Sequence, residues 1–297
     1  MIFAREQLLL NLLDALGGEA GNLDFQKLLL LYTREFETVP SYEFIPYKFG
    51  CFSFSSYADK RRLVKQGLLT EEEQKWQLTD AGRAALRKTK EQWQSMDLFC
   101  RRYGKLRGTP LIALTYRRFP YFATRSEILR NVLPNPDERE MVNAARPARR
   151  GAGLFTIGYE GKSLEAYLNQ LLQASVTILC DVRRNPLSRK YGFSKNTLAK
   201  GCEGVGIRYE HIPELGIASE ARRGLATQAD YEALFTDYKR RSLPRLKNTL
   251  AKIRSWVKKG ECVALTCFER FPAQCHRHCI AEALERSLGR RFTPLHL

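Results

Sequence analysis

The sequence predicts two domains: a mostly helical winged-helix domain, then an α/β domain built on a mainly parallel sheet with helices on both faces. Its 297 residues are enough for two domains of ordinary size. Apolar residues recur at helical spacing over residues 1–130, and short apolar runs alternate with helical segments over residues 153–297. Residues 131–152 are rich in proline, glycine and arginine, which predicts a basic linker.

The composition is that of a globular protein with a large positive charge. Hydrophobic residues make up 44% of the chain and charged residues 27%, which excludes wholesale disorder. Lysine and arginine total 49 against 32 acidic residues, and the net charge of +17 comes from residues 101–297. This excess excludes a strongly acidic protein and favours a polyanionic partner, usually nucleic acid.

Nothing in the sequence predicts a membrane or a secreted protein. No run approaches the ~18–20 apolar residues of a membrane span, and the first residues lack a basic leader followed by an apolar run. The eight cysteines are therefore expected to be reduced thiols. We expect a cytoplasmic protein.

The elements of the first domain follow one another as in a winged helix. The predicted helices cover residues 4–16, 25–36 and 55–66, and a further helix starts near residue 80. Asp24 is the expected cap of the second helix. Two short strands, residues 68–70 and 75–79, flank the acidic tip at residues 71–73.

Three strings in this domain resemble known modules. They are Tyr-Lys-Phe-Gly-Cys-Phe-Ser-Phe, Gln-Gly-Leu-Leu and Trp-Gln-Leu-Thr-Asp-Ala-Gly, at residues 47–54, 66–69 and 76–82. Together they resemble the winged-helix modules of phage-defence and toxin-neutralising proteins. That resemblance implies binding to DNA or to protein.

Basic residues at three places are candidates for DNA contact. They lie on the third helix, beside a cluster of aromatic residues and in the linker: Lys60, Arg61, Arg62, Arg117, Arg118, Arg146, Arg149 and Arg150. The acidic tip argues against duplex binding by the wing. The alternative for the third helix is that its basic residues form a solvated face. The alternative for the aromatic cluster is that its rings belong to a core.

In the second domain, strands and helices alternate. Strands are expected at residues 154–158, 176–182, 207–212, 262–268 and 293–297. Helices are expected at residues 163–173, near 195–202, twice within 229–258, and near 275–287. Ligands bind beyond the carboxyl ends of the strands in such sheets, so the residues there are the site candidates.

These strand ends carry acids, cations and aromatic rings. The candidate catalytic residues are Asp181, Glu269 and Glu160. The candidate substrate-binding residues are Tyr159, Arg183, Arg184, Ser188, Lys195, His211, His276 and Arg277. Asp181 follows an apolar strand, so it is expected to be partly desolvated and kept ionised by Arg183 or Arg184. The alternative is an Asp–Arg pair that only fixes the next loop.

Five motifs at these ends resemble one family. They are Thr-Ile-Gly-Tyr-Glu-Gly-Lys-Ser, Asp-Val-Arg-x-x-Pro-x-Ser, Phe-Ser-Lys, Gly-Ile-x-Tyr-x-His-x-Pro-x-Leu-Gly and Cys-Phe-Glu-x-x-Pro-x-x-Cys-His-Arg. Over residues 154–297 the chain resembles the bacterial domain-of-unknown-function 488 family. The pairing with a winged helix resembles arrangements in defence and DNA-modification loci. The resemblance gives Cys275, His276 and Arg277 a place in the motif without a role.

Other motifs give weaker indications. Gly158 and Gly161 are too close for a phosphate-binding P-loop, which excludes an ATPase of that class. Cys275 and Cys279 lack a second pair at zinc-ligand spacing, although Cys267 is a possible further ligand. Cys267 is also a candidate nucleophile, with His211 or His276 as its base.

Three functions remain open. The favoured one is a DNA glycosylase-like enzyme that flips a modified base into a pocket and stabilises the sugar cation with a carboxylate. Its chemistry needs no cation, so we expect no metal and no cofactor. The alternatives are a metal-dependent nuclease, and a non-enzymatic DNA-binding regulator with an α/β ligand-sensing domain.

Overall fold

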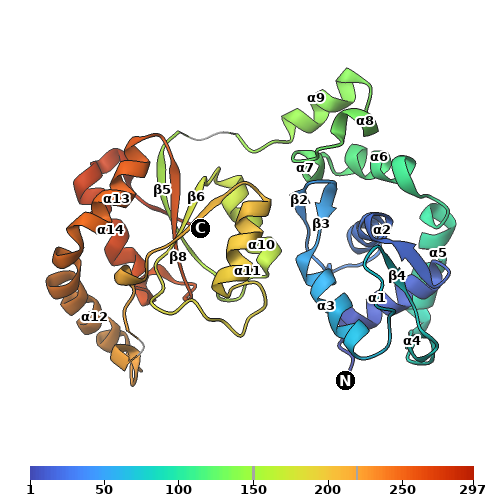
Figure 1. The fold of residues 1–297 in the computed structure, drawn as a ribbon, viewed down its shortest axis with the longest axis horizontal. Helices are drawn as coiled ribbons and strands as arrows, with labels where there is room; N and C mark the ends of the chain where they lie inside the picture. The colour runs from blue at the N-terminus through green and yellow to red at the C-terminus, as the bar shows by residue number, and fades with distance from the viewer. Residues whose placement is uncertain (149–150, 219) are drawn as a thin grey trace. The chain divides into compact units, whose positions relative to one another are not determined.

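The computed structural model describes residues 1–148, 151–218 and 220–297. The chain divides into two compact units, Met1–Arg146 and Pro147–Leu297 (Figure 1). In the part of the chain that is described, no helix is long and apolar enough to span a bilayer.

The first unit is mostly helical. Its helices are α1 (Ala4–Ala15), α2 (Asn22–Glu35), α3 (Phe54–Lys65), α4 (Asp80–Ala84), α5 (Lys90–Tyr103), α6 (Gly108–Arg118), α7 (Pro120–Ala123), α8 (Leu129–Val132) and α9 (Pro136–Ala144). Two antiparallel two-stranded sheets pair β1 (Glu19–Gly21) with β4 (Lys75–Gln77), and β2 (Ile45–Tyr47) with β3 (Gly50–Phe52). The core is rich in leucine, and α1 and α2 supply most of these leucines.

The predicted helices of this unit are present, but two local predictions differ from the structure. Helix α2 begins at Asn22, so Asp24 lies in its first turn and accepts a hydrogen bond from the Gly108 amide (2.8 Å) instead of capping. The predicted wing strands meet only at the Leu69–Leu78 bridge, because β4 takes β1 as its main partner.

Part of the expected linker is folded. The predicted segment, residues 131–152, contains the end of α8 and the whole of α9, and Val142 of α9 is fully buried. Asn135 caps α9 by accepting a hydrogen bond from the Asp137 amide (3.0 Å), and Pro136 occupies the first helical turn. Proline favours that position because the missing N–H has no partner there. The proline that suggested a linker therefore starts a helix.

The second unit is built on a five-stranded parallel sheet in the order β7-β6-β8-β5-β9. Its strands are β5 (Gly153–Gly158), β6 (Ile178–Asp181), β7 (Arg208–His211), β8 (Cys262–Cys267) and β9 (Leu295–His296). Its α-helices are α10 (Leu164–Gln173), α11 (Lys195–Gly204), α12 (Gln228–Asp237), α13 (Lys247–Lys258) and α14 (Arg277–Leu288). The predicted strands and helices of this unit are confirmed.

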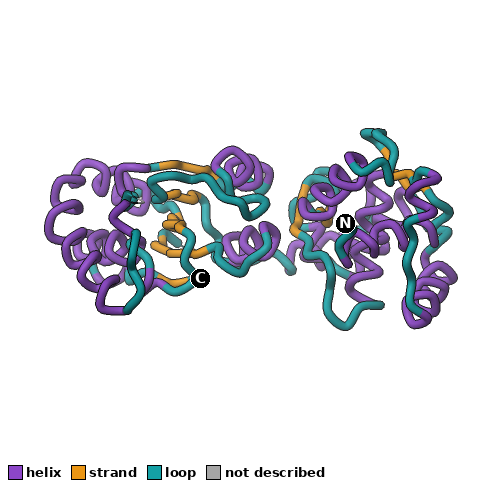
Figure 2. The backbone as a smooth tube through the Cα atoms, turned by 90° about the horizontal axis from the view of Figure 1, so that it is seen from below, coloured by secondary structure: helices purple, strands orange, loops and turns teal. Residues whose placement is uncertain are grey.

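Helices cover both faces of the sheet. Helices α10 and α11 lie on one face, and α12, α13 and α14 lie on the other (Figure 1). The turned view in Figure 2 shows the strands between the helices. After β6 the chain continues to β7 at one edge, whereas after adjacent β8 it continues to β9 at the other. This divergence marks the position where parallel sheets bind ligands.

Candidate active site

A cavity of about 420 Å³ opens at the carboxyl ends of β5, β6 and β8. Its lining combines a carboxylate, aromatic rings, cations, a thiol and an imidazole: Tyr159, Arg183, Arg184, Asn185, Leu187, Ser188, Arg189, Lys190, Ile217, Cys267, Phe268, Glu269 and His276. The volume lies within the range of about 300–1,000 Å³ that is typical of small-molecule sites.

Two glycines allow the loops of the site to approach the sheet closely. A Cβ atom on Gly158, at the end of β5, would lie 1.9 Å from the backbone oxygen of Glu269. A Cβ atom on Gly216 would lie 2.1 Å from the backbone nitrogen of Arg184. Both positions therefore require glycine for steric reasons.

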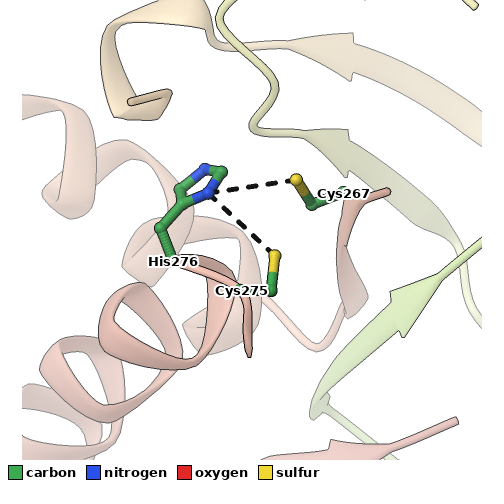
Figure 3. A group of neighbouring side chains, drawn as sticks. All are labelled: Cys267, Cys275 and His276. Carbon is green, nitrogen blue, oxygen red and sulfur yellow. Dashed lines mark hydrogen bonds between the residues drawn. The ribbon is translucent and has the colours of Figure 1, made fainter. Parts of the chain in front are cut away.

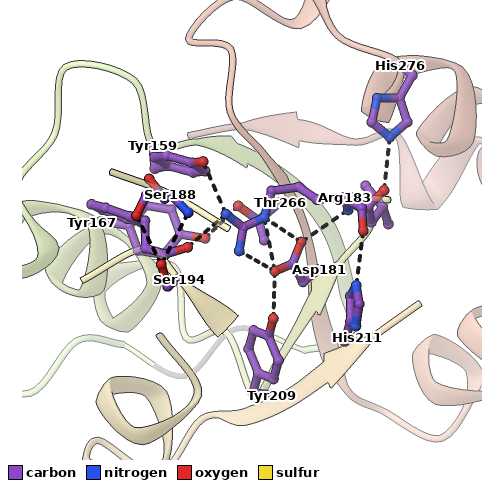
Figure 4. A network of polar contacts seen from close by, with 12 residues as sticks. Tyr159, Tyr167, Asp181, Arg183, Ser188, Ser194, Tyr209, His211, Thr266 and His276 are labelled. Carbon is purple, nitrogen blue, oxygen red and sulfur yellow. Dashed lines mark hydrogen bonds and ion pairs between the residues drawn. The ribbon is translucent and has the colours of Figure 1, made fainter. Parts of the chain in front are cut away.

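Asp181 and Arg183 form a buried ion pair beside the cavity (Figure 4). Arg183 Nε donates to Asp181 Oδ1 (2.8 Å), and Arg183 Nη2 donates to Asp181 Oδ2 (2.5 Å). The Tyr209 hydroxyl also donates to Oδ2 (2.6 Å), and the Arg183 amide donates to Oδ1 (3.1 Å). Asp181 is 0% exposed and does not line the cavity, so this arrangement matches the alternative in which the pair braces the following loop.

The ion pair changes the proton affinity of its neighbours. Burial lowers the pKa of Arg183, but the hydrogen bonds and negative charge of Asp181 raise it by more, so the guanidinium stays charged. Burial and the Asp181 charge raise the pKa of the Tyr209 hydroxyl well above its ordinary value. Both groups therefore hold the protons that the network needs.

Arg183 also anchors the loop after β6. Its Nη1 donates to the Phe193 carbonyl (2.8 Å) and to the Tyr159 hydroxyl (3.1 Å). Ser188 belongs to the fold of this loop: its amide donates to Ser194 Oγ (3.1 Å), and its carbonyl accepts from the same hydroxyl (3.0 Å). The anchored loop carries the cations that line the cavity.

Two histidines bind the first carbonyls of this loop. His276 Nε2 lies 3.0 Å from the Val182 oxygen, and His211 Nε2 lies 3.0 Å from the Arg183 oxygen. A carbonyl only accepts, so each Nε2 carries the hydrogen and the lone pair of a neutral ring is on Nδ1. Only His276 lines the cavity, while His211 supports the loop from the side of β7.

Cys267, Cys275 and His276 form a buried cluster at the cavity (Figure 3). His276 Nδ1 lies 3.9 Å from Cys267 Sγ and 4.0 Å from Cys275 Sγ. Burial, and then the hydrogen bond with Cys267, raise the pKa of the Cys275 thiol well above its ordinary value. His276 is thus the predicted base that reaches Cys267, and His211 bonds elsewhere.

The remaining sequence candidates occupy distinct places. Glu269 lines the cavity, whereas the Glu160 carboxylate accepts a hydrogen bond from the Arg270 amide (2.9 Å) outside it. Arg277 is buried and donates to the carbonyls of Glu269 (2.5 Å) and Arg270 (3.0 Å), so it shapes the loop after β8. Lys195 is exposed at the start of α11 and does not line the cavity.

The aromatic rings of the cavity differ in access. Tyr159 is buried, with Phe193 stacked on its ring at a centroid distance of 4.4 Å and Arg183 5.1 Å from its centroid. Phe268 stands nearly perpendicular to Tyr159 and is 43% exposed. Phe268 is therefore the ring of the two that is open to a ligand.

In the first unit, the sequence candidates for DNA contact are mostly engaged within the fold. Lys60 is 6% exposed, and its ammonium donates to Asn22 Oδ1 (3.2 Å) and to the carbonyls of Glu72 (3.0 Å) and Lys75 (2.6 Å). It therefore braces the segment before β4 and is largely removed from solvent. The aromatic residues beside Arg117 and Arg118 contribute largely to the core, as the alternative predicted.

Exposed arginines of this unit differ in their partners. Arg62 pairs with Glu6, Arg117 with Glu138 and Arg118 with Glu35, at 3.0, 2.6 and 2.8 Å. Arg61 and Arg146 are exposed. Arg149 and Arg150 lie outside the described residues.

Sequence reasoning missed several lining residues. Arg189 and Lys190 lie several residues after the end of β6. Phe268 lies between Cys267 and Glu269, two residues that the sequence does mark as candidates. For Arg189 and Lys190, the sequence signal was two adjacent basic residues in the loop that follows a buried strand. The sequence pattern makes Cys267 a candidate only as a nucleophile or a further metal ligand.

One family model matches a part of the second unit. The model of the domain of unknown function DUF488 matches residues 163–284. The match spans α10 through most of α14 and includes most of the cavity. It supports the resemblance of the second unit to this family. No curated protein and no solved structure matches the chain.

Proposed function

We propose that the second unit is a DNA glycosylase-like hydrolase that releases modified bases, with Glu269 as the carboxylate at the reacting sugar. The observation that carries the proposal is the cavity itself. It brings Glu269 together with the open ring of Phe268 and with a cationic rim at the carboxyl edge of the sheet. In this proposal the carboxylate serves the sugar, the aromatic ring stacks on the base, and the cations bind the phosphates.

In the proposed reaction, the bond between C1′ of the sugar and the base nitrogen breaks, and its electron pair leaves with the base. The positive charge that develops on the sugar ring is stabilised by the ionised carboxylate of Glu269. Water adds to C1′ and gives up one proton, which balances the proton that the departing base takes up. Phe268 would stack on the flipped base.

The structure favours Glu269 over Asp181 in this role. Both Asp181 oxygens are occupied by Arg183 and Tyr209, and the carboxylate is enclosed. A carboxylate that serves a sugar cation must face the substrate. Glu269 lines the cavity, which supports this residue for the role.

The cavity rim supports DNA as the polyanion. Arg184, Arg189 and Lys190 line the cavity, and Arg184 and Arg189 are exposed. Burial lowers the pKa of Lys190, and the nearby Glu160 charge partly offsets this effect. Each phosphate that such a cation neutralises adds about −0.9 to the slope of log affinity against log salt.

The first unit fits the proposal as a module of the winged-helix type. Helices α1, α2 and α3 followed by β4 support this assignment. On α3 the exposed cations Arg61 and Lys65 line a hollow together with the acidic tip, Glu71–Glu73. The acidic tip would repel a phosphate there, so we assign the main DNA contacts to the cationic rim of the second unit.

The test is incubation of the full chain with unmodified and modified phage DNA. Released bases are identified by mass spectrometry, and abasic sites by strand cleavage in alkali. We expect base release from modified DNA only. Glu269→Gln should reduce it by about 100-fold or more, because a preorganised charge at the reacting centre is lost.

Glu160→Gln is the matched control, since this acid lies at the same edge but outside the cavity. Its base release should remain close to that of the wild type. Strand cleavage without alkali or released base would replace the proposal with a nuclease. DNA binding without either product would favour the regulator.

A further inference from the structure

We propose that Cys267, Cys275 and His276 bind one zinc ion whose fourth coordination position faces the cavity. The two sulfurs and a ring nitrogen of these residues lie within 4.8 Å of one another, and all three residues are buried. Two thiolates and an imidazole suit zinc among the common divalent ions. The proposal concerns metal binding alone and does not depend on base release.

The distances are close to those of a zinc-bound set. Zinc lies about 2.3 Å from sulfur and about 2.0–2.1 Å from nitrogen, so neighbouring ligands of a tetrahedral ion are about 3.6 Å apart. The observed separations from Nδ1 are 3.9 Å to Cys267 Sγ and 4.0 Å to Cys275 Sγ. Closing these gaps needs shifts of a few tenths of an ångström.

His276 is held in the tautomer and orientation that a metal ligand requires. Its Nε2 donates to the Val182 carbonyl at 3.0 Å, so Nδ1 presents its lone pair toward the two sulfurs. This carbonyl–histidine pairing is the usual support of a metal-bound imidazole, because it fixes the ring and raises ligand basicity.

The backbone brings the second cysteine back to the first. Cys267 ends β8, and the turn at Pro272–Gln274 returns the chain so that Cys275 and His276 precede α14. The Cys275 amide donates to the Pro272 carbonyl (2.9 Å), which fixes this turn. Cys279, the sequence-based partner of Cys275, instead lies 3.3 Å from His278 Nε2.

The open position gives the site its expected chemistry. Cys267 and His276 line the cavity, so an ion between them would complete its coordination from the cavity side. Three protein ligands and one exchangeable position are typical of catalytic zinc, which lowers the pKa of its bound water to about 7.

The experiment measures metal content directly. The full chain is produced with zinc, purified with a reductant and no chelator, and analysed by inductively coupled plasma mass spectrometry. We expect one zinc ion per chain. Cobalt substitution should give the visible bands of a tetrahedral thiolate site. Cys267→Ser, Cys275→Ser and His276→Gln should each weaken zinc binding by more than about tenfold.

Cys279→Ser and Cys202→Ser are the controls, since both thiols are buried and lie outside the cluster. Both should retain the metal. A second measurement covers variants that fail to fold: zinc should protect Cys267 and Cys275 of the wild type from alkylation, while half-buried Cys100 reacts equally with and without zinc.

Three results would overturn the proposal. The first is a zinc-loaded wild type that holds far less than one ion per chain. The second is equal metal content in ligand variants and controls. The third is rapid alkylation of Cys267 despite zinc, which would favour the thiol nucleophile. Because metal content is measured without DNA, this test and the base-release test fail independently.

Discussion

Replacing Asp181 by asparagine tests whether this carboxylate braces the loop or takes part in chemistry. The change keeps the shape of the side chain and removes the charge opposite Arg183. In the wild type that charge accepts from two guanidinium nitrogens at 2.8 and 2.5 Å. The arginine would keep its bonds to the Phe193 carbonyl and the Tyr159 hydroxyl, but it would be a buried cation without a counter-charge.

The magnitude follows from the burial of both partners. The side chains of Asp181 and Arg183 are 0% and 6% exposed, so solvent screens the pair little. Breaking a buried pair by removing one partner costs about 3–5 kcal/mol. For a unit of this size, 1 kcal/mol corresponds to about 2–4 °C, so the melting temperature should fall by roughly 10 °C.

The assay combines thermal melting, urea unfolding and base release. Adding Arg183→Gln to Asp181→Asn should cost less than the sum of the two single changes, with a coupling energy of about 1–3 kcal/mol. Base release per folded molecule should stay within about tenfold of the wild type, because the Asp181 charge does not face the cavity. An Asp181→Asn protein of wild-type stability that releases no base would refute the bracing role and return the catalytic role to Asp181.

Three further changes test other parts of the fold. Lys60→Ala should destabilise the first unit by about 1–3 kcal/mol in urea unfolding, because it removes the donor that holds the carbonyls of Glu72 and Lys75. An unchanged stability would contradict the bracing contacts, and Arg61→Ala is the control. Gly158→Ala should cost about 2–3 kcal/mol and reduce base release, since its Cβ meets a backbone oxygen at 1.9 Å. Gly151→Ala, where a Cβ meets nothing within 4 Å, should leave both unchanged. Burial raises the pKa of Tyr116 from 10.0 to about 12, so its contribution to stability is present below pH 10 and is lost as the pH rises toward 12. Tyr116→Phe should remove that part of the alkaline decline in urea unfolding, and an identical decline would show that other groups cause it.

The helical spacing of apolar residues, and the alternation of apolar runs with helical segments, were sufficient to predict most of the secondary structure. In the second unit, short apolar runs separated by helical segments predicted the parallel sheet and the edge at which the cavity opens. These features are local, because the burial of a strand or helix face imposes its own repeat on neighbouring residues. The same local signals misjudged residues 131–144, where a proline that starts a helix resembled the proline of a linker.

Only the tertiary structure decided which strand-end residues reach the cavity. Asp181 pairs in register with Thr266, and the Thr266 hydroxyl accepts from Tyr167 of α10, so both side chains lie on the α10 side of the sheet. Cys267 is the next residue of β8, and the pleat directs its side chain to the opposite side, toward His276. Cys275 and His276 approach Cys267 through the turn at Pro272–Gln274. No periodic pattern in the sequence predicts where this turn directs the chain. Strand ends are recognisable along the chain, but the packing of loops and helices above the sheet determines which side chains meet, and that packing depends on contacts between residues far apart in sequence.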